Sequence, residues 1–179
     1  MPANLRDPRA RDVAARRAPD EVRRPRTLAA THRSGHDGDM DPALRDILVA
    51  GSNGALTTIK RDGQPQLSLV TYAIDPEASL VRVSTTDGRA KVANLRRDPR
   101  SSLFVTSASG WSYAVAQGTV ELSPTAQDEH DATVEDLVAL YRDAQGEHPD
   151  WDDYRRAMVA DRRLVVRLRV EHVYGVAQG

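Results

Sequence analysis

Residues 84–91 place three hydroxyl groups and two cations in one short stretch, Ser-Thr-Thr-Asp-Gly-Arg-Ala-Lys. A β-rich run ends in the hydroxyls, and a helix is expected to begin with Arg89 and Lys91 in its first turn. Cations are disfavoured there because the N-terminal end of the helix dipole is already positive. An anion bound among the free N–H groups, the hydroxyls and the two side chains would make both positions favourable. The alternative is that both cations point to solvent or pair with Asp87 and Asp98.

Gln66 and Ser68 are a second candidate pair. They are two residues apart in a β-rich run, so they lie on one face of the expected strand. Both are uncharged hydrogen-bonding side chains among apolar neighbours, which a planar ligand with carbonyl and N–H edges would need. Taken alone, the pattern favours the solvent-facing side of a strand.

The segment Gly110-Trp111-Ser112 places a tryptophan at the head of an expected strand, in a chain with only 4% aromatic residues. An indole there can form a stacking wall for a ring, although the residue alone favours a plug at the end of a barrel or a contact between subunits. Small residues follow at alternate positions, Ala114 and Ala116. A face of this kind allows close approach by a second sheet or by a planar ring.

The composition excludes several kinds of site. The 179 residues contain no cysteine, which excludes disulfides, thiolate nucleophiles and cysteine-based metal centres and fits a cytoplasmic location. There is no Rossmann or P-loop glycine motif, no His-Glu-x-x-His and no Gly-x-Ser-x-Gly, and the five histidines are scattered, so we predict no metal site. A net charge of −1 does not indicate nucleic-acid binding, and no apolar run approaches the ~20 residues that a membrane span needs.

Turn and cap signals divide the chain into short elements. Asp41-Pro42 starts a helix that Gly51 ends, and Asp62-Gly63 between two β-rich runs is typical of a hairpin. The expected elements are helix 42–50, strands 54–60, 65–72 and 79–85, helix 88–97, strands 101–107 and 111–122, helices 133–144 and 151–160, and strands 164–170 and 173–176. This order predicts a mainly β (α+β) fold, a closed or split antiparallel barrel with short peripheral helices.

One folded domain is expected at residues 40–179. Residues 1–39 contain nine arginines against six acidic residues, several prolines and few large apolar side chains. Such a segment buries too little surface to offset an ordering cost of roughly 1–2 kcal/mol per residue. We therefore expect a disordered Arg/Pro-rich extension, or a true start at Met40, rather than a basic tail that binds nucleic acid.

Four separated stretches share a resemblance to one family. They are KRDGQPQLS, VST…GRAKVANLRRDPR, GWSYAVAQGTVEL and GEHPDWDDYRRAMVADRR…VYG. Together they span about residues 41–175 and resemble the split β-barrel flavin/deazaflavin oxidoreductases. These are the pyridoxamine 5'-phosphate oxidase-like proteins, and the match is to the branch that binds coenzyme F420, a 5-deazaflavin.

The resemblance implies a homodimer with a cofactor site at each side of the subunit interface. The implied cofactor contacts are Ser84, Thr85, Arg89 and Lys91 at the phosphate, Pro65, Gln66 and Ser68 along the ring, Gly110, Trp111 and Ser112 from the other subunit, and Arg163 in the ADRR motif. The chain departs from its close relatives at Leu69, where they have a polar residue.

The implied activity is hydride transfer between coenzyme F420 and a small electron-poor organic substrate, such as one with a conjugated C=C or C=N bond. No residue is assigned as catalytic, because solvent or a hydroxyl such as that of Tyr72 can deliver the proton. Two alternatives stay open: an FMN-dependent oxidase or reductase of the same fold, and a non-catalytic F420-binding or storage protein.

Overall fold

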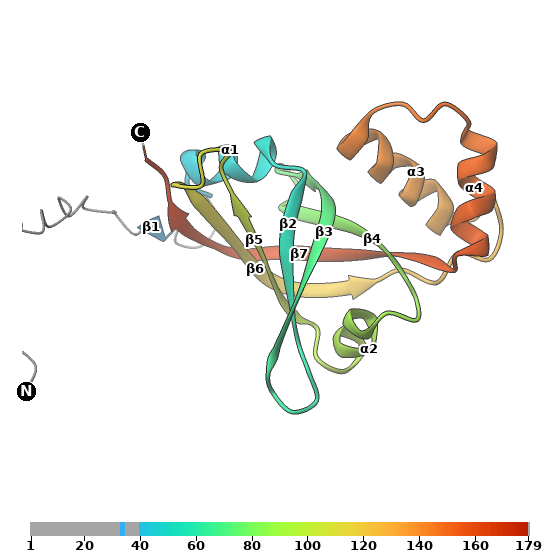
Figure 1. Cartoon of the computed structure of the whole chain (residues 1–179), viewed down its shortest axis with the longest axis horizontal. Coiled ribbons are helices and arrows are strands. Elements are labelled where there is room, and N and C mark those ends of the chain that lie inside the picture. The colour runs from blue at the N-terminus through green and yellow to red at the C-terminus, as the bar shows by residue number, and fades with distance from the viewer. Residues whose placement is uncertain (1–32, 35–39, 179) are drawn as a thin grey trace, which may run out of the picture.

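The computed structural model describes residues 33–34 and 40–178, and one antiparallel sheet dominates them (Figure 1). Its strand order is β1-β7-β4-β3-β2-β5-β6, and a further pairing of β6 with β7 closes it into a barrel. The strands are β1 (Arg33–Ser34), β2 (Asn53–Ile59), β3 (Pro65–Asp75), β4 (Leu80–Thr86), β5 (Arg100–Thr106), β6 (Tyr113–Leu122) and β7 (Arg163–Val176). The extension expected at residues 1–39 lies outside the described residues, except for β1, which pairs with β7.

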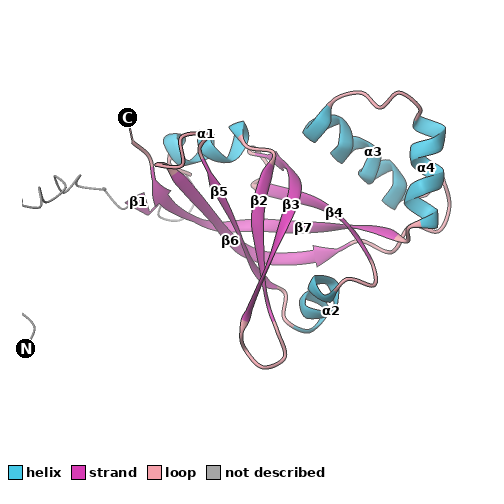
Figure 2. Cartoon of the chain, in the orientation of Figure 1, coloured by secondary structure: helices cyan, strands magenta, loops and turns pink. Residues whose placement is uncertain are grey.

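Four helices surround the barrel (Figure 2). They are α1 (Pro42–Ala50), α2 (Ala90–Arg97), α3 (Ala132–Gln145) and α4 (Trp151–Ala160). Helices α1 and α2 lie at opposite ends of the barrel, while α3 and α4 form a pair beside the β3–β4–β7 side. The predicted mainly β split barrel with short peripheral helices is confirmed.

The β2–β3 hairpin forms where the turn signal predicts it. Gly63 has a φ of 82° and donates its N–H to the carbonyl of Lys60 at 3.0 Å. Glycine adopts this left-handed conformation without a steric penalty. The hairpin projects beyond the body of the barrel (Figure 1).

The strands expected at 164–170 and 173–176 are one strand, β7, so that boundary was wrong. The register between β6 and β7 shifts between Gln117 and Gly118, which bends the ladder without ending it. A Cβ on Gly118 would lie 1.8 Å from the carbonyl oxygen of Arg169, so only glycine permits this approach.

The small side chains of β6 face the inside of the barrel. Ala114 and Ala116 are fully buried in the core cluster that includes Leu103 and Val173. The expectation that this face receives a second sheet or a ring is therefore wrong, because the chain's own barrel fills the space. Strand β6 begins at Tyr113, so Trp111 precedes the strand instead of heading it.

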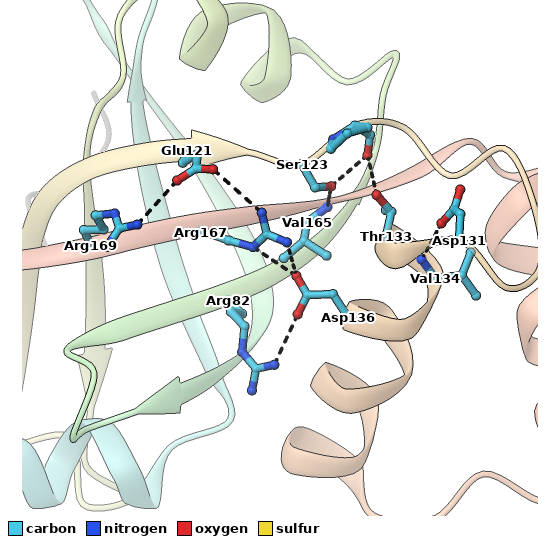
Figure 3. A network of polar contacts seen from close by, with 11 residues as sticks. Arg82, Glu121, Ser123, Asp131, Thr133, Val134, Asp136, Val165, Arg167 and Arg169 are labelled. Atoms are coloured by element: carbon cyan, nitrogen blue, oxygen red, sulfur yellow. Dashed lines mark hydrogen bonds and ion pairs between the residues drawn. The ribbon is translucent and has the colours of Figure 1, made fainter.

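Helix α3 is held to the barrel by a network of ion pairs (Figure 3). Asp136 accepts from Arg82 of β4 at 3.3 Å and from Arg167 of β7 at 2.6 Å. The side chains of Arg82 and Asp136 are only 14% and 16% exposed, so this pair is well shielded from water. The network fixes α3 over β4 and β7, and with it one wall of the pocket described next.

Candidate functional site

Strands β3 and β4 pair along only part of their length, and the last pair is Tyr72 with Val83. Beyond it, residues 65–71 of β3 pair only with β2, and residues 84–86 of β4 pair only with β7. The barrel is therefore split between these two segments. Each segment has one edge whose backbone N–H and C=O groups face no neighbouring strand.

A pocket of 460 Å³ opens at this split. It is lined by both strand edges, the start of α2, the start of β7, and the helices α3 and α4. Five residues predicted to contact a cofactor meet in it: Ser84, Thr85, Arg89, Lys91 and Arg163. No aspartate or glutamate is among the described residues that line it, so the pocket is cationic.

Arg89 and Lys91 have no acidic partner within the described part of the chain. The two carboxylates that could have paired with them are engaged elsewhere. Asp87 pairs with two other arginines, and Asp98 pairs with Arg100 at 2.7 Å. The alternative in which Arg89 and Lys91 pair with these acids is therefore not the observed arrangement.

The environment of Lys91 disfavours its charged form when no anion is bound. Lys91 is half-buried, and desolvation, followed by the nearby charge of Arg89, lowers the pKa of its ammonium group. Arg89 is the N-cap of α2 and makes no side-chain cap hydrogen bond. Val92 and Ala93 already donate their N–H groups to the carbonyl of Arg89, so an anion here would accept from the N–H groups of Ala90 and Lys91 and relieve the repulsion between the two cations.

Arg163 joins the pocket from β7. It lies directly opposite Thr86 of β4, and opposite residues of an antiparallel pair have their side chains on one face. Its guanidinium also binds Asp161 at 3.1 Å, and the side chain is 32% exposed. Arg163 therefore adds positive charge beside β4. Asp161 offsets part of that charge.

Gln66 and Ser68 lie on one face of β3, as predicted, and both are half-buried. That face is the barrel side, whereas Leu69 and Thr71 point to the opposite side. Gln66 lines a separate hollow beside α2 and accepts a hydrogen bond from Asn94 at 2.7 Å. Pro65, Gln66 and Ser68 are not lining residues of the split pocket, and their contact with a ring stays a prediction.

Gly110, Trp111 and Ser112 lie in the β5–β6 loop, at the end of the barrel near α1 and away from α2 (Figure 1). None of them lines the split pocket. Trp111 is 71% exposed, and Ser112 Oγ accepts from the backbone N–H of Gln178 at 3.0 Å. Within one chain this segment is therefore separate from the residues around Lys91.

Residues 40–177 match the family model of pyridoxamine 5'-phosphate oxidase. That span includes the split barrel, all four helices and every residue of the pocket. The chain belongs to this family. Its members are flavin-dependent oxidoreductases, and the split barrel described above is their fold.

Solved structures of other proteins have the same fold. One is described as an F420 reductase, with 22% identity, a TM-score of 0.60 and coverage of 75% of this chain and 98% of that one. A conserved hypothetical protein from Mycobacterium tuberculosis has 22% identity and a TM-score of 0.61, covering 81% and 89%. A FAD-binding protein from Mesorhizobium loti has 17% identity and a TM-score of 0.54, covering 81% and 96%.

Some lining residues of this family member were missed in the sequence. Leu140, Tyr141, Tyr154 and Met158 come from α3 and α4. From the sequence they belong only to the expected helices 133–144 and 151–160, and most of them pack in an apolar cluster with Val134 and Leu137. The same four side chains also line the split pocket. Only the family motif at 146–163 hinted that this region matters.

Tyr72 is not available as a proton donor, so that suggestion is wrong. Its side chain is 1% exposed, and its hydroxyl donates to the carbonyl of Leu48 at 2.6 Å. Burial raises the pKa of Tyr72 to about 12. The hydroxyl is a structural tie between β3 and α1.

Among the described residues, no cluster of three or more histidine, cysteine or acidic side chains has the geometry to hold a metal ion. No helix in the same part of the chain is long and apolar enough to cross a membrane.

Proposed function

We propose that this member of the pyridoxamine 5'-phosphate oxidase family binds coenzyme F420 and transfers a hydride between it and a small electron-poor organic substrate. The observation behind the proposal is the pair Arg89 and Lys91, unpaired in a carboxylate-free pocket at the barrel split. The likeness to a structure described as an F420 reductase favours a deazaflavin as the cofactor.

The residues of the pocket fit a phosphate-bearing cofactor. Lys91 and Arg89 would neutralise the phosphate, and the hydroxyls of Ser84 and Thr85 would donate hydrogen bonds to it. The free N–H groups at the start of α2 add donors of the same kind. Arg163, on β7, would add a third cation near the phosphate of the cofactor.

The remaining parts of the site would orient the ring and shield it. The unpaired edge of β3 offers backbone donors and acceptors, and Leu140, Tyr141 and Met158 form an apolar and aromatic wall that excludes water. A bound 5-deazaflavin supplies two-electron hydride transfer. No side chain is assigned as catalytic, and with Tyr72 buried the proton would come from solvent.

We further propose that the functional unit is a homodimer. Leu67 and Leu69, on one face of β3, are 65% and 82% exposed, and Trp111 is 71% exposed; a second subunit would cover these apolar side chains. The segment Gly110-Trp111-Ser112 would then complete the site of the other subunit, because within its own chain it does not reach the pocket.

A flavin is the second candidate cofactor, because a similar fold is found in a FAD-binding protein. FMN would use the same cationic pocket, since its phosphate needs the same partners. A cofactor-binding or storage protein without turnover is the third possibility, and the absence of an assigned acid or base among the described residues is compatible with it.

The test is titration of the purified protein with F420 and, separately, with FMN, followed by absorbance and fluorescence. Binding of F420 with higher affinity than FMN supports the deazaflavin, and the reverse order supports the flavin. Bleaching of reduced F420 is then measured against a panel of enones and imines. Tight binding with no turnover of any substrate would favour the storage protein, and binding of neither cofactor would refute the proposal.

A further inference from the structure

We infer that Asn94 is a positioning residue that turns the Gln66 side chain into an obligatory hydrogen-bond donor toward the bound cofactor. The inference rests on the proposed function, because it concerns how that cofactor's ring is recognised. It assigns a role to Asn94, a buried residue of α2 that does not line the split pocket but lines the hollow beside α2 together with Gln66.

Asn94 lies at the junction of α2 with the β2–β3 hairpin. Its side-chain amide nitrogen donates to Thr58 Oγ1 at 3.1 Å and to Gln66 Oε1 at 2.7 Å. Asn94 is 7% exposed and Thr58 is fully buried, so the bond between them is shielded from water, while the bond to the half-buried Gln66 lies at the wall of the hollow. The helix thereby holds the Gln66 side chain at a defined place on β3.

Arg97 determines which end of the Asn94 amide faces which neighbour. A guanidinium can only donate, and Arg97 Nη2 lies 3.4 Å from Asn94 Oδ1. Arg97 is itself fixed, since the same nitrogen donates to the carbonyl of Ile59. The oxygen of Asn94 therefore faces Arg97, and its NH₂ group faces Thr58 and Gln66.

The orientation of the Asn94 amide also fixes the orientation of the Gln66 amide. Because the NH₂ group of Asn94 donates to Gln66 Oε1, the Nε2 end of Gln66 must point away from Asn94. No partner for that NH₂ group is found among the described residues, and Gln66 lines a hollow of 460 Å³ beside α2. A glutamine that could otherwise rotate to accept or donate is thus restricted to donating.

The restriction selects a carbonyl oxygen as the partner. A flavin or deazaflavin ring has carbonyl groups on its pyrimidine portion. Gln66 faces the hollow on the barrel side of β3, and this hollow and the split pocket share the start of α2, where Ala90 lines the hollow and Arg89 and Lys91 line the pocket. Lys91, which would bind the phosphate, is three residues before Asn94 on the same helix. One short helix would thus set both the phosphate contact and, through Gln66, the ring contact.

A double-mutant cycle on the full-length chain tests this coupling, with F420 as the probe. Asn94→Asp replaces the donor by a carboxylate, so Gln66 must turn its NH₂ group inward and present oxygen to the ligand. We expect Kd to rise roughly five- to fiftyfold and the absorption shift of bound F420 to decrease. In a Gln66→Met background, Asn94→Asp should cause a much smaller rise, because the group it acts through is gone.

The cycle also separates orientation from simple charge repulsion. The new carboxylate repels an anionic ligand equally in both backgrounds, so only the difference between them reports on Gln66. Gln64→Ala, an exposed amide on the same hairpin, is the control and should leave Kd unchanged. Melting temperatures of all variants show whether the fold is retained, and Gln66→Glu, which also presents oxygen outward, replaces Asn94→Asp if that variant does not fold.

The outcomes distinguish this inference from the proposed function. An equal effect of Asn94→Asp in both backgrounds, or an unchanged Kd for Gln66→Glu, overturns the role of Asn94 while F420 binding stands. Failure of the unmodified protein to bind F420 or FMN overturns the proposed function and this inference with it.

Discussion

At the scale of single residues, Lys91 is the side chain whose replacement should affect ligand binding most directly. Lys91→Ala should weaken F420 binding by about ten- to a hundredfold, because a charge-assisted hydrogen bond of about 1.5–3 kcal/mol is lost. Lys91 has no ion-pair partner among the described residues, so the melting temperature should barely change. Calorimetric titration measures the first effect and thermal unfolding the second.

Arg100 provides the matched control for Lys91. It is an exposed cation paired with Asp98 and lies outside the pocket. Arg100→Ala should leave Kd unchanged. An unchanged Kd in folded Lys91→Ala would mean that the anion binds elsewhere.

Tyr72 should show the opposite behaviour, a loss of stability without a loss of binding. Tyr72→Phe leaves the carbonyl of Leu48 without its buried donor, which costs about 1–2 kcal/mol. The melting temperature should fall by about 2–8 °C, while F420 affinity and any turnover stay the same. A selective loss of turnover in a stable Tyr72→Phe protein would restore the hydroxyl as a proton donor.

At the scale of elements, Asp136 joins α3 to two arginines of the barrel, while Asp143 of the same helix pairs with Arg82 alone among the described residues. Asp136→Ala would leave Arg82 and Arg167 shielded from water with their shared partner removed (Figure 3). The free energy of unfolding should fall by about 1–3 kcal/mol. Glu77→Ala, which breaks the exposed pair with Arg45, should cost less than about 1 kcal/mol. Denaturant unfolding of both variants compares the two, and equal losses would contradict the role of the network.

The same scale shows why some features follow from sequence and others do not. The Asp62-Gly63 turn and the Asp41-Pro42 helix start are local signals, so the hairpin and α1 were predictable. The limit of the β3–β4 pairing at Tyr72 and Val83 is non-local, because it depends on β2 and β7 taking the other edges. The orientation of Ala114 was missed for a related reason. Alternation predicts two faces but not which of them faces the barrel.

The candidate site divides in the same way. Residues 84–91 are contiguous, so the anion-site cluster could be found from spacing and helix electrostatics alone. The wall from α3 and α4 comes from residues about fifty or more positions further along the chain, and the sequence predicted only two helices there. Gln66 was recognised as a polar position on β3, but its link to Asn94 required the packing of α2 against the hairpin.

At the scale of the whole molecule, the proposed homodimer predicts a cofactor site built from residues of two subunits. Lys91 and Trp111 lie in different regions of the chain, and only Lys91 lines the pocket. If Trp111 completes the partner's site, Lys91→Ala and Trp111→Ala proteins should each bind F420 weakly. A heterodimer of the two would have one site with both residues intact and one site with neither.

Mixing the two variants after mild unfolding and refolding should therefore restore high-affinity sites. One site per heterodimer is expected, and tandem affinity tags allow the heterodimer to be isolated for titration. Sedimentation at micromolar concentration checks that the dimer is the binding species. If the mixture shows no more binding than the two variants measured separately, or if a monomer binds F420 fully, both determinants act within one chain. Trp111, exposed at the far end of the barrel, would then need a different role.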